Sequence, residues 1–207
     1  MTHSLHRQGD EKTLCRDYVW QVYPSRGIND TNLAEKYARV IDLVVDLGCE
    51  NFGDVKTGSS LHVPVDTIRA NLSDRSRLRG VFTSMEQVRE FVRRMRDLDV
   101  GLSVIIAGLT DKIFAACQEA DVVPHSVNLA LGVWGRTELL PPEDVLALTT
   151  MCGHHQISPA FVQEMREQIA KGSVTVSEAA RRMASLCPCG IFNQDRAAEL
   201  LMDEPVS

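Results

Sequence analysis

Three cysteines in the last third of the chain lie in surroundings typical of metal sites. Cys152 is followed by His154 and His155, and Cys187 is separated from Cys189 by a single proline. Thiolates bind iron–sulfur clusters and zinc, and histidine can complete either set of ligands. In a reducing compartment, clustered cysteines more often bind metals or react than form disulfides. The spacing therefore predicts a metal site with three thiolate ligands.

An iron–sulfur cluster, of the 4Fe-4S type, is the leading prediction for Cys152, Cys187 and Cys189. Three cysteine ligands leave one iron of such a cluster open, and an open iron can act as a Lewis acid on a small anionic substrate. A closed tetrahedral zinc site, with one histidine as fourth ligand, is the alternative, and it would stabilise a protein-interaction module. Electron transfer by a fully ligated cluster to a redox partner, and a redox-active Cys187–Cys189 pair, are further alternatives.

Five further residues carry side chains suited to a substrate. His154 and His155 are predicted to transfer protons beside the metal, the alternative being loop histidines bonded to backbone carbonyls. Lys56 lies among small hydroxyl residues and glycine, a composition that favours either anion binding or a solvated turn. Asn128 and Arg136 lie around the end of a predicted strand, where ligands often bind. The sequence leaves open whether the chain is an enzyme. If it is an enzyme, we expect an iron–sulfur-dependent lyase, sulfur transferase or oxidoreductase.

The remaining cysteines and the arginines predict structure rather than chemistry. Cys15, Cys49 and Cys117 are expected to be packing residues, because free cysteine behaves as a small buried hydrophobe. Seven arginines lie between residues 75 and 96. Those on one helical face predict a solvated surface, with docking of an acidic partner as the alternative.

Composition excludes several classes of protein. The chain has 207 residues, of which 44% are hydrophobic and 24% charged, as in ordinary globular domains. The net charge of −6, all of it after residue 100, argues against a nucleic-acid-binding scaffold. No apolar run approaches the roughly 20 residues of a membrane span, and the N-terminus lacks the apolar core of a signal peptide. We expect a cytoplasmic protein that binds neither nucleic acid nor membrane and is compatible with a homo-oligomer.

Residues 1–140 are predicted to form an α/β domain. Strand-like and helical segments alternate along it, with strands at 18–23, 81–82, 101–109 and 126–134 and helices at 32–47, 85–98 and 111–120. This alternation predicts a mixed sheet with some parallel pairing, and an α+β arrangement is the alternative.

Residues 141–207 are predicted to form a C-terminal all-helical unit that holds the metal. Strand signals stop after Pro141 and Pro142, and Ser158 and Thr175 are suited to cap helices. A helix follows each cysteine loop, so free backbone N–H groups at the helix start can stabilise anionic sulfur. The helix pair between the two loops is expected to bring the loops together.

Four segments of the last third carry a family resemblance. They are Asn-Leu at 128–129, Gly-Val-Trp-Gly-Arg-Thr-Glu-Leu-Leu at 132–140, Met-Cys-Gly-His at 151–154 and Cys-Pro-Cys-Gly-Ile-Phe-Asn at 187–193. Together, over about residues 126–201, they resemble an uncharacterised microbial family of predicted iron–sulfur proteins. The resemblance implies cluster binding by Cys152, Cys187 and Cys189, and it implies no particular reaction.

Overall fold

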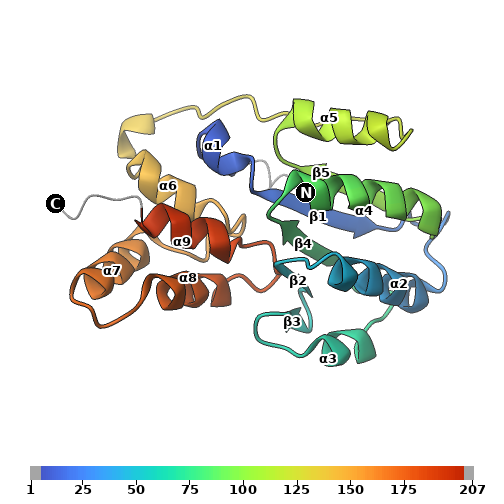
Figure 1. Ribbon diagram of the computed structural model, residues 1–207, viewed down its shortest axis with the longest axis horizontal. Coiled ribbons are helices and arrows are strands. Elements are labelled where there is room, and N and C mark those ends of the chain that lie inside the picture. The colour runs from blue at the N-terminus through green and yellow to red at the C-terminus, as the bar shows by residue number, and fades with distance from the viewer. Residues whose placement is uncertain (1–5, 203–207) are drawn as a thin grey trace.

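The computed structural model describes residues 6–202 and shows a mixed α+β fold (Figure 1). In chain order its elements are α1 (Glu11–Leu14), β1 (Tyr18–Tyr23), α2 (Leu33–Asp46), β2 (Asn51–Asp54), β3 (Gly58–Ser59), α3 (Val65–Ala70), β4 (Leu78–Phe82), α4 (Met85–Leu98), β5 (Ser103–Ala107), α5 (Thr110–Glu119), the 3₁₀ helix η2 (Thr137–Leu139), α6 (Glu143–Thr149), α7 (Pro159–Ala170), α8 (Val176–Ser185) and α9 (Gln194–Met202).

The five described strands form one sheet in the order β3-β2-β4-β1-β5, and every neighbouring pair is antiparallel. Helix α2 connects β1 to β2, and α4 connects β4 to β5; in both cases another strand lies between the two connected strands. This is the split βαβ, or ferredoxin-like, arrangement. The prediction of a mixed sheet with parallel neighbours is therefore wrong. A sheet of parallel neighbours and a split βαβ sheet show the same alternation of strands and helices along the sequence. In this protein, each helical crossover leaves a gap of one strand position in the sheet, and an antiparallel strand fills that gap.

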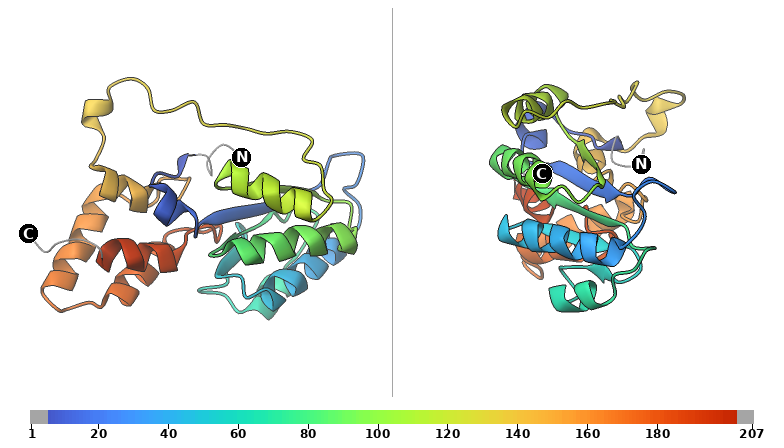
Figure 2. Two further views of the ribbon diagram at one scale, coloured as in Figure 1. Left: turned by 45° about the horizontal axis from the view of Figure 1, so that its top comes forward. Right: turned by 90° about the vertical axis from the view of Figure 1, so that its right-hand side faces the viewer.

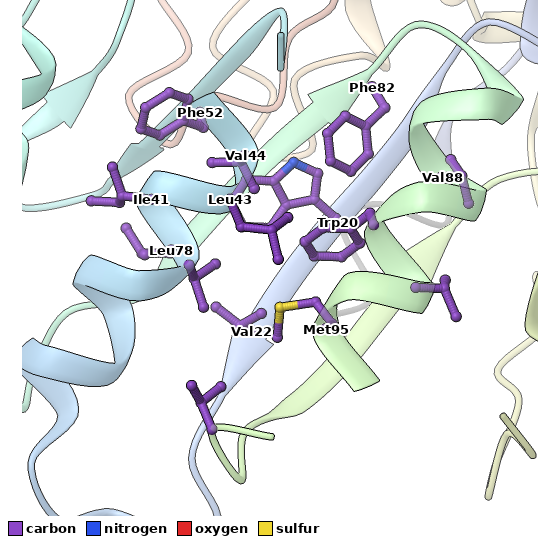
Figure 3. Close-up of a cluster of buried hydrophobic side chains, with 14 of the residues drawn as sticks. Trp20, Val22, Ile41, Leu43, Val44, Phe52, Leu78, Phe82, Val88 and Met95 are labelled. Carbon is purple, nitrogen blue, oxygen red and sulfur yellow. The ribbon is translucent and has the colours of Figure 1, made fainter. Parts of the chain in front are cut away.

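Helices α2 and α4 cover one face of the sheet, and the core between them is built around Trp20 of β1 (Figure 3). Because side chains alternate along a strand, Tyr18, Trp20 and Val22 all contribute to this core. The ring centroids of Trp20 and Phe91 lie 5.5 Å apart. The Nε1 atom of Trp20 donates to the Sγ atom of Cys49 at 3.3 Å. Cys49 therefore packs in this core, as predicted.

Helix α4 shows how local sequence fixes an element. The Ser84 side chain accepts a hydrogen bond from the Gln87 backbone N–H, and the Gln87 side chain returns to Ser84, which is a capping box. Apolar residues then recur at helical spacing, so that one face is buried against the sheet. The residues of that face are Val88, Phe91, Val92 and Met95.

Residues 121–136 form an extended connection from α5 to η2 that passes clear of the sheet (Figures 1 and 2). The strand predicted at 126–134 is therefore wrong for the chain as it is described. Its side chains are exposed throughout. A strand forms only where a neighbour accepts its backbone hydrogen bonds, and none of the described strands lies beside it.

Helices α6 to α9 gather at one end of the sheet and enclose a second core (Figure 1), in agreement with the predicted helical unit. Helix α7 packs on α6 and α8, and α9 packs on α6 and α8. This core meets the sheet unit at Val19, Leu61 and Ala107. Val19 lies on the face of β1 opposite to Trp20. Among the described helices, none is long and apolar enough to cross a membrane.

Candidate metal centre

The two cysteine loops, one between α6 and α7 and the other between α8 and α9, meet inside the helical unit. The Sγ atoms of Cys187 and Cys189 lie 3.7 Å apart, and the Sγ atom of Cys189 lies 3.8 Å from Nδ1 of His154. Cys152 is in hydrogen-bond contact with Cys187. All three cysteines are at most 1% exposed. The prediction that the helix pair brings these loops together is confirmed.

Backbone N–H groups surround the three sulfur atoms. Those of His154 and Gln156 bond to the sulfur of Cys152, and that of Ile191 bonds to the sulfurs of both Cys187 and Cys189. Each of these bonds lowers the pKa of the thiol that accepts it, because an N–H dipole stabilises the thiolate.

Glycine 190 lets the second loop lie directly against the sheet. Its φ angle is +73°, and a Cβ atom there would stand 2.4 Å from the carbonyl carbon of Phe52 and 2.6 Å from the amide nitrogen of Gly53. Nearby, the side chain of Asn51 donates to the carbonyl oxygen of Phe192 at 3.3 Å. These contacts fix Cys189 beside strand β2.

Arg79 of β4 brings a positive charge to the same place. In the sheet, Arg79 pairs with Gly53 of β2, and Gly53 is also a neighbour of Gly190. The pKa of Cys189 is lowered to about 7, mainly by the hydrogen bond with Cys187 and also by the charge of Arg79, against the opposing effect of burial. The hydrogen bond with Cys187, together with burial, raises the pKa of Cys152. Negative charge in this group of thiols therefore settles first on Cys189.

A buried ionic network clamps the two cysteine loops to the N-terminal segment. The guanidinium of Arg7 donates to the carbonyl oxygens of Met151, at 3.2 Å, and of Ile191. It also pairs with Asp17, whose other carboxylate oxygen accepts from Arg196 at 2.7 Å. Asp17 and Arg196 are at most 1% exposed. Burial lowers the pKa of Arg196, whereas the carboxylate of Asp17 raises it.

Sequence reasoning missed this network. Arg196 of α9 is buried, whereas an arginine in a helix is ordinarily expected at the surface. Its partners, Asp17, Gln8 and Thr13, lie almost the whole chain away. The only signal in the sequence was the presence of charged residues near both ends, and that signal does not say which of them pair.

The two histidines of the first loop lie at the surface above the thiols. His154 and His155 are exposed, and only His154 reaches a sulfur. His155 adopts a φ of +55°, and its ring centroid lies 6.4 Å from that of His6. The thiols are thus closed off from solvent, with His154 at their outer side.

The other predicted binding residues do not join this group. Lys56 is exposed in the turn between β2 and β3. Asn128 and Arg136 are exposed on the connection before η2, and the Nε atom of Arg136 lies 3.0 Å from Glu138. Among the described residues, no hydrogen bond or ion pair joins Lys56, Asn128 or Arg136 to one of the three cysteines. Two surface hollows, one beside α5 and one bordered by α2, α4 and α5, are also lined by none of the predicted site residues.

Arginines of the segment 75–96 form ion pairs on the exposed surface of α4. Arg89 pairs with Glu119 across α4 and α5, and Arg93 pairs with Glu90 and Asp97 along α4. These exposed pairs make the helix face largely self-neutralising, which agrees with a solvated surface.

Within residues 6–202, no three His, Cys, Asp or Glu side chains already converge as a ready-made metal site. Comparison with family models, with curated proteins and with solved structures found no match to this chain. The resemblance to predicted iron–sulfur proteins therefore stays a prediction, and the geometry of the thiols alone must support a function.

Proposed function

We propose that the chain is a protein-interaction module whose helical unit is held together by a single metal ion, zinc, bound by Cys152, Cys187, Cys189 and His154. The observation that carries this proposal is the distance between donor atoms. In a tetrahedral zinc site with Zn–S bonds of about 2.3 Å, two sulfurs lie about 3.8 Å apart, and a sulfur and a histidine nitrogen about 3.6 Å. In this structure the sulfur atoms of Cys187 and Cys189 lie 3.7 Å apart, and the sulfur of Cys189 lies 3.8 Å from Nδ1 of His154.

Burial supports a structural role for this ion. Structural zinc sites are closed, with all four positions taken by protein ligands, whereas catalytic sites keep one open. The three thiols are shielded from solvent. The lowered pKa of Cys189 and the N–H groups around all three sulfurs favour the thiolates that zinc requires. Because the donors do not yet converge, binding must include rotation of at least one ligand side chain.

An iron–sulfur cluster on the same three cysteines is the second candidate. One observation favours it: the N–H groups of His154, Gln156 and Ile191 bond to the sulfurs, as is typical of cluster sites. In this version the open iron would face His154 and His155, which would transfer protons to a small anionic substrate. Two thiolates on different irons must stand farther apart than two on one ion, so the 3.7 Å separation of Cys187 and Cys189 favours zinc.

Both candidates require reduced thiols, so the proposal includes a reducing, cytoplasmic setting for the working protein.

Metal analysis after anaerobic purification tests the proposal. We expect a colourless protein with one zinc per chain, and loss of that zinc in Cys187→Ser. Cys117→Ser is the matched control, because this buried cysteine lies in the other core. A brown protein that contains iron and inorganic sulfide would instead support the iron–sulfur cluster and contradict the zinc site. A protein that binds neither metal, even after reconstitution, would contradict both candidates.

A further inference from the structure

The two edges of the sheet are protected very differently. At one edge, β3 has only two residues, and a short edge strand offers little backbone for another chain to pair with. At the other edge, β5 has five residues, Ser-Val-Ile-Ile-Ala, with no charged residue and no proline. Every residue of β5 is at least partly exposed. Proteins commonly guard such an edge with lysine, proline or a covering helix, and the β5 sequence contains neither of those residues.

The same chain contains a strand pattern that has no sheet. From Ser126 to Trp134 the sequence has no charged residue, and Val127, Leu129, Leu131 and Val133 alternate with smaller or polar residues. Strict alternation is typical of a strand with one buried face. These four side chains and Trp134 are each at least 53% exposed. Figure 2 shows this stretch passing from α5 to η2 away from the sheet.

We propose that residues 126–134 of one copy pair with the free edge of β5 in a second copy, and that the exchange is reciprocal. The edge offers unpaired backbone groups, the segment offers an apolar strand pattern, and neither carries charge. In a closed two-fold pair each copy donates one segment and accepts one, so two edges and two segments are satisfied together. A foreign partner that added a strand to β5 would leave the segment exposed. This proposal is independent of the metal.

Molecular mass in solution tests the proposal with the full chain. Light scattering after size-exclusion chromatography should give a dimer. Ala130→Pro, which removes a backbone donor from the segment, and Val104→Lys, which places a charge on the edge, should each abolish it. Ile28→Lys is the matched control, because Ile28 is 84% exposed but lies in neither element, and it should stay dimeric.

Mixing the two variants gives a sharper result. The Ala130→Pro copy keeps its edge and the Val104→Lys copy keeps its segment, so the mixture should form a heterodimer that neither variant forms alone. A wild-type monomer at all concentrations would overturn the proposal, and so would a dimer that both variants retain. Monomers whose amides at 126–134 resist hydrogen exchange would also overturn it, by showing that the segment folds onto its own β5.

Discussion

The two cores of this protein are built from different material. The core between the sheet and α2 and α4 contains Trp20, Tyr37, Phe82 and Phe91. The core of the helical unit contains four alanines, three methionines and three cysteines, and Phe192 is its one fully buried aromatic residue. Aromatic side chains bury far more apolar area than alanine or cysteine. The sheet unit can therefore be stable by packing, whereas the helical unit needs further links.

Size leads to the same conclusion. The helical unit runs from α6 to α9, and its helices are short, from 7 to 12 residues. A unit of fewer than about 70 residues rarely gains more than about 3–5 kcal/mol from its core, and such units commonly add a metal or disulfides. The buried Arg7–Asp17–Arg196 network supplies one such link here, and the proposed zinc ion on the three thiols would supply another. Substitutions in each unit can test whether the two units depend on different forces.

The largest effect is expected at Trp20. Trp20→Ala should lower the free energy of unfolding by about 3–5 kcal/mol, because it opens a cavity at the centre of the sheet core. Urea denaturation followed by circular dichroism measures the loss. Ile28→Ala is the control, since Ile28 is 84% exposed and lies outside the helices and strands of the described residues. Similar stabilities for the two variants would contradict the packing-based account of the sheet unit.

The next effect is expected at Arg196. Arg196→Met should cost about 3 kcal/mol, the lower end for breaking a buried ion pair, because Asp17 keeps its contacts to Arg7 and Asn193. Metal content should also fall, since this network holds the loop that follows Cys189. Arg181→Met removes an exposed pair with Glu178 and serves as the control. If both variants unfold at the same urea concentration, the network does not link the units.

The docking of the second cysteine loop can be tested with two glycines. Gly190 and Gly172 have similar φ angles, +73° and +68°, but only Gly190 has backbone atoms in the way of a Cβ. Gly172→Ala should cost about 1–2 kcal/mol through backbone strain alone. Gly190→Ala should cost more and should weaken metal binding, because the loop must move off β2. Equal costs in thermal denaturation would mean that the close contact with Phe52 and Gly53 is unimportant.

The sequence predicted helices better than it predicted their surroundings. The starts of α7 and α8 follow from the local caps predicted at Ser158 and Thr175, and both caps are present. The meeting of Cys152 with Cys187 could also be predicted, because a helical hairpin joins their loops. Strand neighbours could not be predicted, because the same β-α-β pattern fits parallel or split pairing. The network around Asp17 could not be predicted either, since its partners are distant in sequence.

The smallest effect is expected at Glu50, where the two units meet. Burial raises the pKa of Glu50 and the charge of Asp195 raises it further, although Gln194 opposes the shift. The folded protein therefore holds this proton more tightly, and stability falls as pH rises from the unfolded pKa of Glu50 through its folded pKa. Glu50→Gln should be more stable than the wild type at neutral pH and equal to it in acid. Parallel stability–pH curves for the two proteins would contradict this expectation.

Hydrogen exchange with and without a chelator tests the central claim most directly. Mass spectrometry reports the protection of each segment of the intact chain. On removal of zinc, we predict that amides of α6 to α9 lose protection while those of β1, β4, α2 and α4 keep it. Equal protection of the helical unit before and after chelation would contradict the account, because that unit would then be stable without a metal ion.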